Sequence, residues 1–167
     1  LKEDVEKHAA DICRLTHADP RCVGASVIIS ALIHSLVYEE RLLPLEKLIR
    51  IGRRYDERIE PYLKLAQADT LKGLDLDDEA SMGYTLKTMA AGIWCIYHAT
   101  SFEEGLLAIV NEGGDADTNG AVAGSLLGAK YGYDAIPPQY IEGLTRKDML
   151  WRIIERYLKI YNFTDEV

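Results

Sequence analysis

Cysteine and phenylalanine are scarce in this 167-residue sequence, which contains three Cys and two Phe. The three cysteines, Cys13, Cys22 and Cys95, are odd in number and show no paired spacing. Neither a disulfide scaffold nor a Cys-x-x-Cys metal site is therefore expected, and Cys22 and Cys95 are interpreted as small buried apolar residues. A reducing, cytoplasmic location follows as the expectation.

Basic residues are outnumbered by acidic ones. Nineteen Lys and Arg against twenty-seven Asp and Glu give a formal net charge of −8 at pH 7. This excess of acid argues against nucleic acid or an anionic membrane surface as the main partner. The longest apolar stretch, residues 23–38, is interrupted by Ser26, Ser30, His34 and Ser35, and we expect it to be too short and too polar to span a bilayer.

The sequence also lacks a convincing alternation of apolar and polar residues, which is the pattern of a half-buried strand. Apolar residues instead recur with helical spacing nearly throughout, and a hydrophobic share of 48% is enough to fill a core. Asp19-Pro20 is expected to open one helix, and a second is expected to begin near Pro44 and to kink or end at Pro61. The sequence predicts a single all-α domain over residues 1–167.

Residues 113–119 (GGDADTN) are the most informative for function. Asp115, Asp117 and Thr118 supply two carboxylates and a hydroxyl where a helix is expected to begin, and Mg²⁺ prefers oxygen ligands of this kind. A helix N-terminus also favours Asp at its cap and in its first turn, so helix capping is the structural alternative. One Asp would suffice for capping, and the second, beside Thr118, leaves an excess that capping does not explain.

Three glycines follow at every fourth position, Gly120, Gly124 and Gly128. Each glycine inside a helix costs about 1 kcal/mol relative to alanine. Their common face predicts a neighbouring helix that packs very close, which would hold the Asp-bearing N-terminus rigidly. Ordinary tight packing without a functional purpose is the alternative.

Two further positions carry side chains suited to ligand binding. His17 precedes the helix that Asp19-Pro20 opens, and a histidine there can act as a general acid or base or bind a substrate. Tyr84, which follows Gly83, can offer a flat face to a nucleobase. A structural histidine and a partly buried tyrosine are the alternatives, and the residues alone leave both open. An acidic run over residues 75–79 is expected to be a solvated surface loop.

Taken together and in this order, these stretches resemble the ADP-ribosylglycohydrolase family, which includes the dinitrogenase-reductase-activating glycohydrolases. The resemblance covers about residues 15–141. The residues that carry it are 16–20 (THADP), 83–85 (GYT), 91–94 (AGIW), 101–106 (SFEEGL), 113–118 (GGDADT), 123–124 (AG), 128–132 (GAKYG) and 135–137 (AIP). The Gly-Gly-Asp-x-Asp-Thr element followed by a helix of small residues is the most specific of them.

The resemblance implies a fold, a reaction and a set of site residues. The implied fold is a compact orthogonal bundle of helices, and the implied reaction is hydrolysis of the bond between ADP-ribose and a protein side chain or small acceptor. Two Mg²⁺ ions, or alternatively Mn²⁺, are implied at the centre of a cleft. The implied metal ligands are Asp115, Asp117 and Thr118. The implied substrate-binding residues are His17, Tyr84, Gly113 and Gly114.

One departure from the family pattern concerns the N-terminal part. Elements of the Gly-Asp-Ala-x-Gly and Thr-Asp-Asp-Thr types, which carry an acidic catalytic residue and the other metal ligands, are not found here. Asp77-Asp78 is the only adjacent Asp pair and lacks flanking threonines. We therefore expect the chain, which begins with Leu1, to be the C-terminal half of such a domain, incomplete at its N-terminus, with half of the metal site and an unknown general base.

This departure leaves other functions open. The chain can be a non-catalytic module, degenerate or truncated, that binds ADP-ribose or a protein. It can also be a plain helical module in which GGDADT serves only as a cap. An incomplete bundle would leave apolar surface uncovered, and this predicts association with an N-terminal segment or a homodimer.

Overall fold

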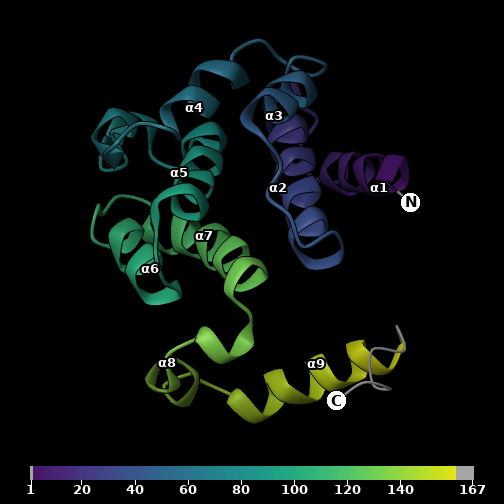
Figure 1. Ribbon diagram of the computed structural model, residues 1–167, viewed down its shortest axis with the longest axis vertical. Helices are drawn as coiled ribbons and strands as arrows, with labels where there is room; N and C mark the ends of the chain where they lie inside the picture. Colours follow the sequence, from purple (N-terminus) through teal and green to yellow (C-terminus); the bar gives the residue numbers. More distant parts are fainter. Residues whose placement is uncertain (1, 161–167) are drawn as a thin grey trace. The chain divides into compact units, whose positions relative to one another are not determined.

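The computed structural model describes residues 2–160, and their side chains from residue 4 onward. These residues form helices and turns without a strand, which confirms the all-α prediction (Figure 1). The α-helices are α1 (Lys2–Arg14), α2 (Pro20–Tyr38), α3 (Leu45–Gly52), α4 (Ile59–Leu65), α5 (Thr85–His98), α6 (Phe102–Val110), α7 (Ala116–Tyr131), α8 (Pro138–Glu142) and α9 (Lys147–Ile160). Three short 3₁₀ helices are η1 (Leu71–Leu74), η2 (Glu79–Ser81) and η3 (Tyr133–Ala135).

The chain divides into two compact units, Leu1–Ala135 and Ile136–Val167. The first contains α1 to α7 and the second contains α8 and α9. Compact units of this kind can belong to one domain, so the single domain over residues 1–167 stays a prediction. All of the residues expected to form the functional site lie in the first unit.

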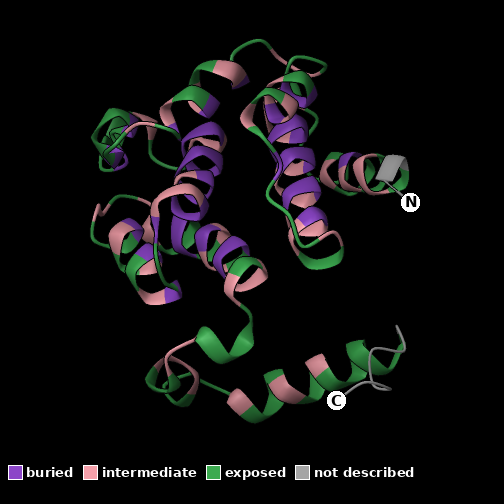
Figure 2. Cartoon of the chain, viewed as in Figure 1, coloured by how far each residue is buried: buried purple, intermediate pink, exposed green. Residues whose placement is uncertain are grey.

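Two apolar helices, α2 and α5, contribute more buried residues to the core of the first unit than any other helix (Figure 2). α2 packs against α1, α3, α5 and α7, and α5 packs against α4, α6 and α7. Side chains such as Ile28 and Leu32 from α2 and Leu86 and Ile93 from α5 are fully buried. Burying an aliphatic side chain of this size contributes about 1.5–3 kcal/mol relative to leaving it exposed. This core holds the N-terminal ends of α2, α5 and α7 in a fixed arrangement.

By length and composition α2 is apolar enough to cross a membrane, which contradicts the expectation drawn from its serines and His34. The core helix of a soluble protein can be equally long and apolar. In α2, 44% of the most apolar stretch is buried inside the structure. The expectation that no membrane is a partner stays a prediction.

The helix predicted from Pro44 towards Pro61 is in fact two helices. α3 ends at Gly52, and α4 begins at Ile59 with Pro61 inside its first turns. A Cβ atom added at Gly52 would lie 2.6 Å from Cγ2 of Ile59, so the glycine allows the chain to fold back closely between the two helices. Proline is tolerated near a helix start because the first turn has no intrahelical acceptor for its missing N–H group.

The close packing around α7 depends mainly on glycines of its neighbours. A Cβ atom added at Gly92 of α5 would lie 3.0 Å from Leu126, and one added at Gly105 of α6 would lie 2.9 Å from Leu127. By contrast, a Cβ atom at Gly128 would meet nothing within 4 Å. The prediction that all three repeated glycines of α7 face a very close helix is therefore wrong for Gly128.

Candidate functional site

A cavity of about 560 Å³ lies between the C-terminal end of α1, the first half of α2 and the N-terminal ends of α5 and α7. Three residues selected from the sequence, His17, Tyr84 and Thr118, line it together although they are far apart in the chain. Each comes from the segment just before a helix or from its first turn. Asp115 and Asp117 lie in the same segment as Thr118, next to the cavity lining.

His17 is held by the turn that links α1 to α2. Its backbone N–H donates to the carbonyl of Cys13 over 2.8 Å, and its Nδ1 lies 2.9 Å from the hydroxyl oxygen of Thr16. Asp19, two residues further on, caps α2 by accepting a hydrogen bond from the backbone N–H of Arg21. The predicted Asp19-Pro20 helix start is therefore confirmed, and it fixes His17 at the entrance to the helix.

Tyr84 is the residue that precedes α5. Its ring meets the ring of Tyr62 edge-on, with centroids 5.5 Å apart, and the guanidinium of Arg21 lies 5.5 Å from its centroid. The adjacent Gly83 has φ +75°, and a Cβ atom added there would lie 3.4 Å from Oδ2 of Asp115. The left-handed turn at Gly83 thus brings the start of α5 alongside the Asp115 carboxylate.

Asp115 occupies the N-cap position of α7, yet its side chain makes no capping hydrogen bond. Its backbone has φ −79° and ψ 54°, and only its carbonyl accepts from the helix, through the N–H of Asn119 at 2.9 Å. The Asp117 carboxylate accepts a hydrogen bond from the backbone N–H of Thr118 over 2.9 Å. Helix capping therefore does not account for the Asp115 carboxylate.

The two glycines before Asp115 have different surroundings. Both are left-handed, with φ +77° at Gly113 and φ +60° at Gly114. A Cβ atom at Gly114 would lie 2.0 Å from the carbonyl oxygen of Leu76, whereas one at Gly113 would meet nothing within 4 Å. Gly114 therefore serves a close backbone contact, and Gly113 leaves open space beside the metal-ligand candidates.

The loop that contacts Gly114 is the acidic run at residues 75–79, expected from the sequence to be only a solvated surface. Its acidic side chains are exposed, but Leu76 is buried. The ammonium group of Lys87, on α5, donates to the carbonyl of Asp75 over 2.5 Å and lies 3.7 Å from the Asp78 carboxylate. The loop therefore packs against the Gly-Gly segment and supports it.

The donor set at the start of α7 fits part of a magnesium site. Asp115, Asp117 and Thr118 offer oxygen atoms alone, as hard divalent cations require. Within residues 4–160, no group of three or more His, Cys, Asp or Glu side chains is placed to hold a metal ion. A complete octahedral shell around Mg²⁺ would therefore need water, a ligand or other residues as well.

Sequence reasoning missed two kinds of residue that line the cavity. Arg21 was not selected, although an Asp two residues before an Arg, at 19–21 and again at 56–58, was a visible signal. Cys22, interpreted as a buried apolar residue, is only half-buried and lines the cavity with Cys13. Cys95 is buried as expected, and this burial raises the pKa of its thiol to about 12.

Several known proteins are similar in sequence to this chain. A family model described as ADP-ribosylglycohydrolase matches residues 2–166. The ADP-ribosyl-[dinitrogen reductase] glycohydrolase of Rhodospirillum rubrum is 31% identical over 146 residues, which is 86% of this chain and 45% of that protein. The ADP-ribosylarginine hydrolase Tri1 of Pseudomonas putida (strain GB-1) is 28% identical over 132 residues, which is 77% of this chain and 33% of that protein.

A solved structure gives a similar result. A chain of an ADP-ribosylglycohydrolase-related protein complex has a TM-score of 0.67 and 30% identity, over 87% of this chain and 50% of that chain. The chain thus spans about a third to a half of the length of these relatives. The family match itself runs over nearly the whole chain, and it does not bear out the expectation that the chain is only the C-terminal half of such a domain.

Proposed function

Since this chain belongs to the ADP-ribosylglycohydrolase family, we propose that it takes part in hydrolysing the bond between ADP-ribose and a modified protein side chain or small acceptor. The observation that supports this most is the convergence of His17, Tyr84 and Thr118 on one cavity. Its volume of about 560 Å³ lies within the range of sites that enclose small ligands. The proposed partner is therefore an ADP-ribosylated substrate.

The candidate site residues take distinct roles in this proposal. Tyr84 offers the face of its ring to the adenosine part of the ligand, and His17 binds near a ribose. Gly113 lets the nucleotide approach the backbone, because nothing lies within 4 Å of a Cβ atom placed there, whereas Gly114 is occupied by its close contact with the Leu76 carbonyl and supports the loop instead. The general base is not assigned to any residue.

The magnesium site is also a proposal. Asp115, Asp117 and Thr118 would hold Mg²⁺, or alternatively Mn²⁺, as part of a two-metal site. When bound, the ion supplies positive charge that orients ribose hydroxyls and polarises a water molecule. The chain's own contribution is to hold these oxygen atoms in place. The contact between Gly114 and Leu76 fixes the loop before α7, and Gly83 keeps the start of α5 close to Asp115.

A second function is supported by one specific observation. Among the described side chains no third acidic, histidine or cysteine residue joins Asp115 and Asp117 in a group that could hold a metal. A chain with these ligands alone would bind ADP-ribose, or a protein that carries it, without hydrolysing the bond. We also propose a cytoplasmic location and association of the chain with an N-terminal segment or with a second copy.

The decisive experiment measures two properties of the same protein. Release of ADP-ribose from an ADP-ribosylated arginine substrate is followed with and without Mg²⁺, and binding of free ADP-ribose is measured by calorimetry. We expect release that depends on Mg²⁺ and that disappears in Asp117→Asn, because the amide lacks the negative charge of a metal ligand. Asp69→Asn, the same change at an exposed position outside the cavity lining, serves as the control.

The outcomes separate the two functions. Binding without release, in the presence of Mg²⁺, would favour the non-catalytic module. Retained release in Asp117→Asn would refute the role given to that residue. Neither binding nor release by the wild-type protein would refute both functions.

A further inference from the structure

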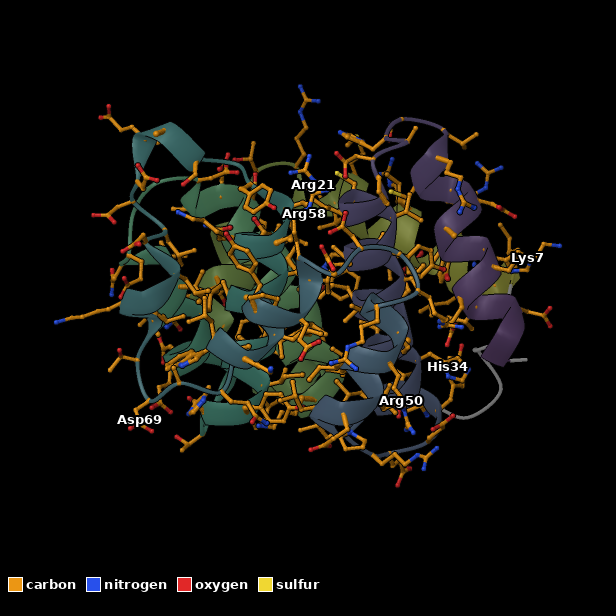
Figure 3. All side chains as sticks on the ribbon, turned by 90° about the horizontal axis from the view of Figure 1, so that it is seen from above. Lys7, Arg21, His34, Arg50, Arg58 and Asp69 are labelled. Carbon is orange, nitrogen blue, oxygen red and sulfur yellow. The ribbon has the colours of Figure 1, made fainter. Side chains whose placement is uncertain are left out.

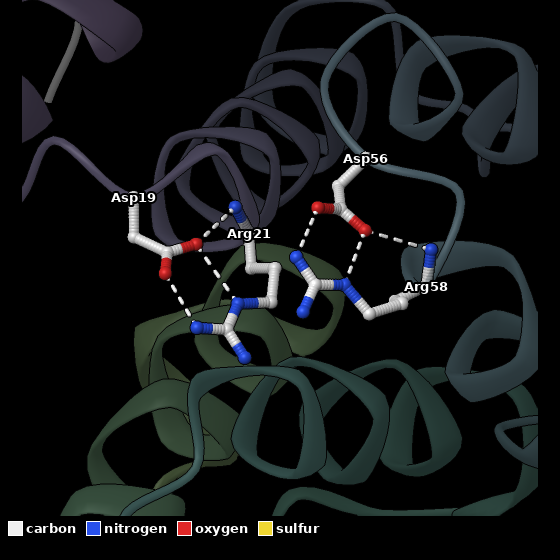
Figure 4. Close-up of polar contacts among 4 residues, drawn as sticks. All are labelled: Asp19, Arg21, Asp56 and Arg58. Atoms are coloured by element: carbon white, nitrogen blue, oxygen red, sulfur yellow. Dashed lines mark hydrogen bonds and ion pairs between the residues drawn. The ribbon is translucent and has the colours of Figure 1, made fainter.

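Two Asp-x-Arg pairs with the same internal geometry lie beside each other in the first unit (Figures 3 and 4). Oδ1 of Asp19 accepts from the backbone N–H of Arg21 at 2.8 Å and from its Nε at 2.9 Å, and Oδ2 pairs with Nη2. In the second pair, Oδ1 of Asp56 accepts from the backbone N–H and Nε of Arg58, both at 2.8 Å, and Oδ2 pairs with Nη2 at 2.6 Å. Each guanidinium is thereby fixed in a two-pronged contact with its carboxylate.

The two arginines differ in what they face. Arg21 lines the cavity that contains His17 and Tyr84, and its side chain is 30% exposed. Arg58 is 56% exposed and lines a different, open groove together with Glu60 and Lys64. The same local motif thus places one cation at the candidate site and the other outside it.

The charge inside the cavity points to the kind of ligand it suits. Among the described residues that line it, Arg21 is the only one with a permanent charge, and none is acidic. The contact with Asp19 raises the pKa of the Arg21 guanidinium, and the neighbouring Tyr84 raises it further, so Arg21 stays protonated. Asp19 engages Nε and Nη2, and the other terminal nitrogen points away from Asp19 (Figure 4). A guanidinium that lines a cavity without an acidic lining residue is suited to an anionic group.

We propose that Arg21 recognises the phosphate groups of the nucleotide ligand in this cavity and that Asp19 is the positioning residue which holds the guanidinium. The inference rests on the proposed function, which supplies ADP-ribose as the ligand. A guanidinium matches phosphate oxygens through paired hydrogen bonds, which a lysine ammonium does not reproduce. Because Asp19 orders the side chain before the ligand arrives, less conformational entropy is lost on binding.

Arg21 also contacts the ring of Tyr84, and this contact is the competing explanation for any loss of binding. An arginine that only orients Tyr84 would affect affinity without interacting with the ligand's charge. The dependence of affinity on salt separates the two roles, because a direct contact between arginine and phosphate weakens as ionic strength rises.

The test measures ADP-ribose binding by calorimetry, at fixed Mg²⁺ and several NaCl concentrations, for the wild-type protein and three variants. We expect Arg21→Gln to weaken binding by about 10- to 100-fold at low salt, the usual effect of removing a charge-assisted hydrogen bond. Its affinity should also fall less steeply with salt than that of the wild type. Arg21→Lys, which keeps the charge but loses the fork, should show a smaller loss and retain most of the salt dependence.

Arg58→Gln is the matched control, because it removes an identical clamp that does not line the cavity. It should bind ADP-ribose within about 2-fold of the wild type, and its melting temperature shows how much the Asp56–Arg58 clamp contributes to folding. Unchanged affinity in Arg21→Gln, a loss without a change in salt dependence, or an equal loss in Arg58→Gln would each overturn the inference. If the wild-type protein binds no ADP-ribose, the proposed function fails and the inference fails with it.

Discussion

Asp19 and Asp115 are the N-cap residues of α2 and α7, but their carboxylates make different contacts. The Asp19 carboxylate caps α2 and clamps Arg21, so the fold engages both of its oxygen atoms. The Asp115 carboxylate makes no capping hydrogen bond to α7 and lies beside Gly83. The comparison shows that an aspartate at a helix start is not explained by the helix alone.

The backbone accounts for the difference. Asp19 is extended, with ψ 127°, which is the usual geometry of a capping residue and brings its side chain over the first N–H groups of the helix. Asp115 follows two left-handed glycines and has ψ 54°. Its carboxylate is therefore left available to a ligand, whereas that of Asp19 is engaged within the protein.

The largest effect expected from this comparison is on activity. Asp115→Asn should reduce Mg²⁺-dependent release of ADP-ribose by more than about 100-fold, because even a residue that merely supports a metal ligand typically contributes 10- to 100-fold. The melting temperature without Mg²⁺ should shift little, since no capping hydrogen bond is lost, and the stabilisation by added Mg²⁺ should disappear. Activity and melting assays on one preparation test both points. Undiminished release of ADP-ribose by the Asp115→Asn protein would show that Asp115 is not a metal ligand.

The next largest effect concerns the two glycines that set the backbone of Asp115. Gly114→Ala should lower the free energy of unfolding by about 3 kcal/mol or more, because it adds a clash with the Leu76 carbonyl to the strain of a left-handed alanine. Gly113→Ala adds only the strain of a left-handed alanine and should lower the free energy of unfolding by about 1–2 kcal/mol. Urea unfolding of both variants measures the difference. Equal losses would show that the contact with Leu76 does not constrain the loop.

A smaller effect is expected at Asp19. Asp19→Ala should lower the melting temperature by about 2–4 °C, because it removes the cap of α2. Asp19→Asn should lower it less, since asparagine caps a helix about as well as aspartate, although it lacks the charge that holds Arg21. Thermal unfolding followed by circular dichroism gives both values. A larger fall in melting temperature in Asp115→Ala than in Asp19→Ala would contradict the conclusion that Asp19 caps its helix and Asp115 does not.

The smallest effect is the dependence of stability on pH. The Arg58 side chain and backbone N–H lower the pKa of Asp56 from its ordinary value of 3.8 to about 2. Because the folded state favours the ionised form, this pair stabilises the protein above pH 4, and the contribution is lost as the pH falls from about 4 to about 2. The difference in melting temperature between the wild type and Asp56→Asn should shrink over that interval. A difference in melting temperature that stays constant over this interval would contradict a lowered pKa of Asp56 in the folded protein.

Helix positions could be predicted because they depend on local patterns. The Asp19-Pro20 start of α2 and the helix expected to begin within residues 113–119 are readable from neighbouring residues, and the structure confirms both as α2 and α7. The boundary at Pro61 was wrong because α3 already ends at Gly52, where the chain turns back so closely that a Cβ atom would clash with Ile59 of α4. Local patterns carry no information about such contacts.

By itself, the sequence determined the all-helical class, the start of α2, the family resemblance, and the candidate site residues other than Arg21 and Cys22. Only the tertiary structure decided that His17, Tyr84 and Thr118 line one cavity, that Arg21 joins them while Arg58 does not, and that Asp115 caps nothing. The physical reason is that hydrogen bonds and apolar spacing along a helix are local, whereas the surroundings of a side chain depend on how the helices pack. Arg21 and Arg58 show this directly, because the same Asp-x-Arg motif has two different settings once α2 and α4 each pack against α5.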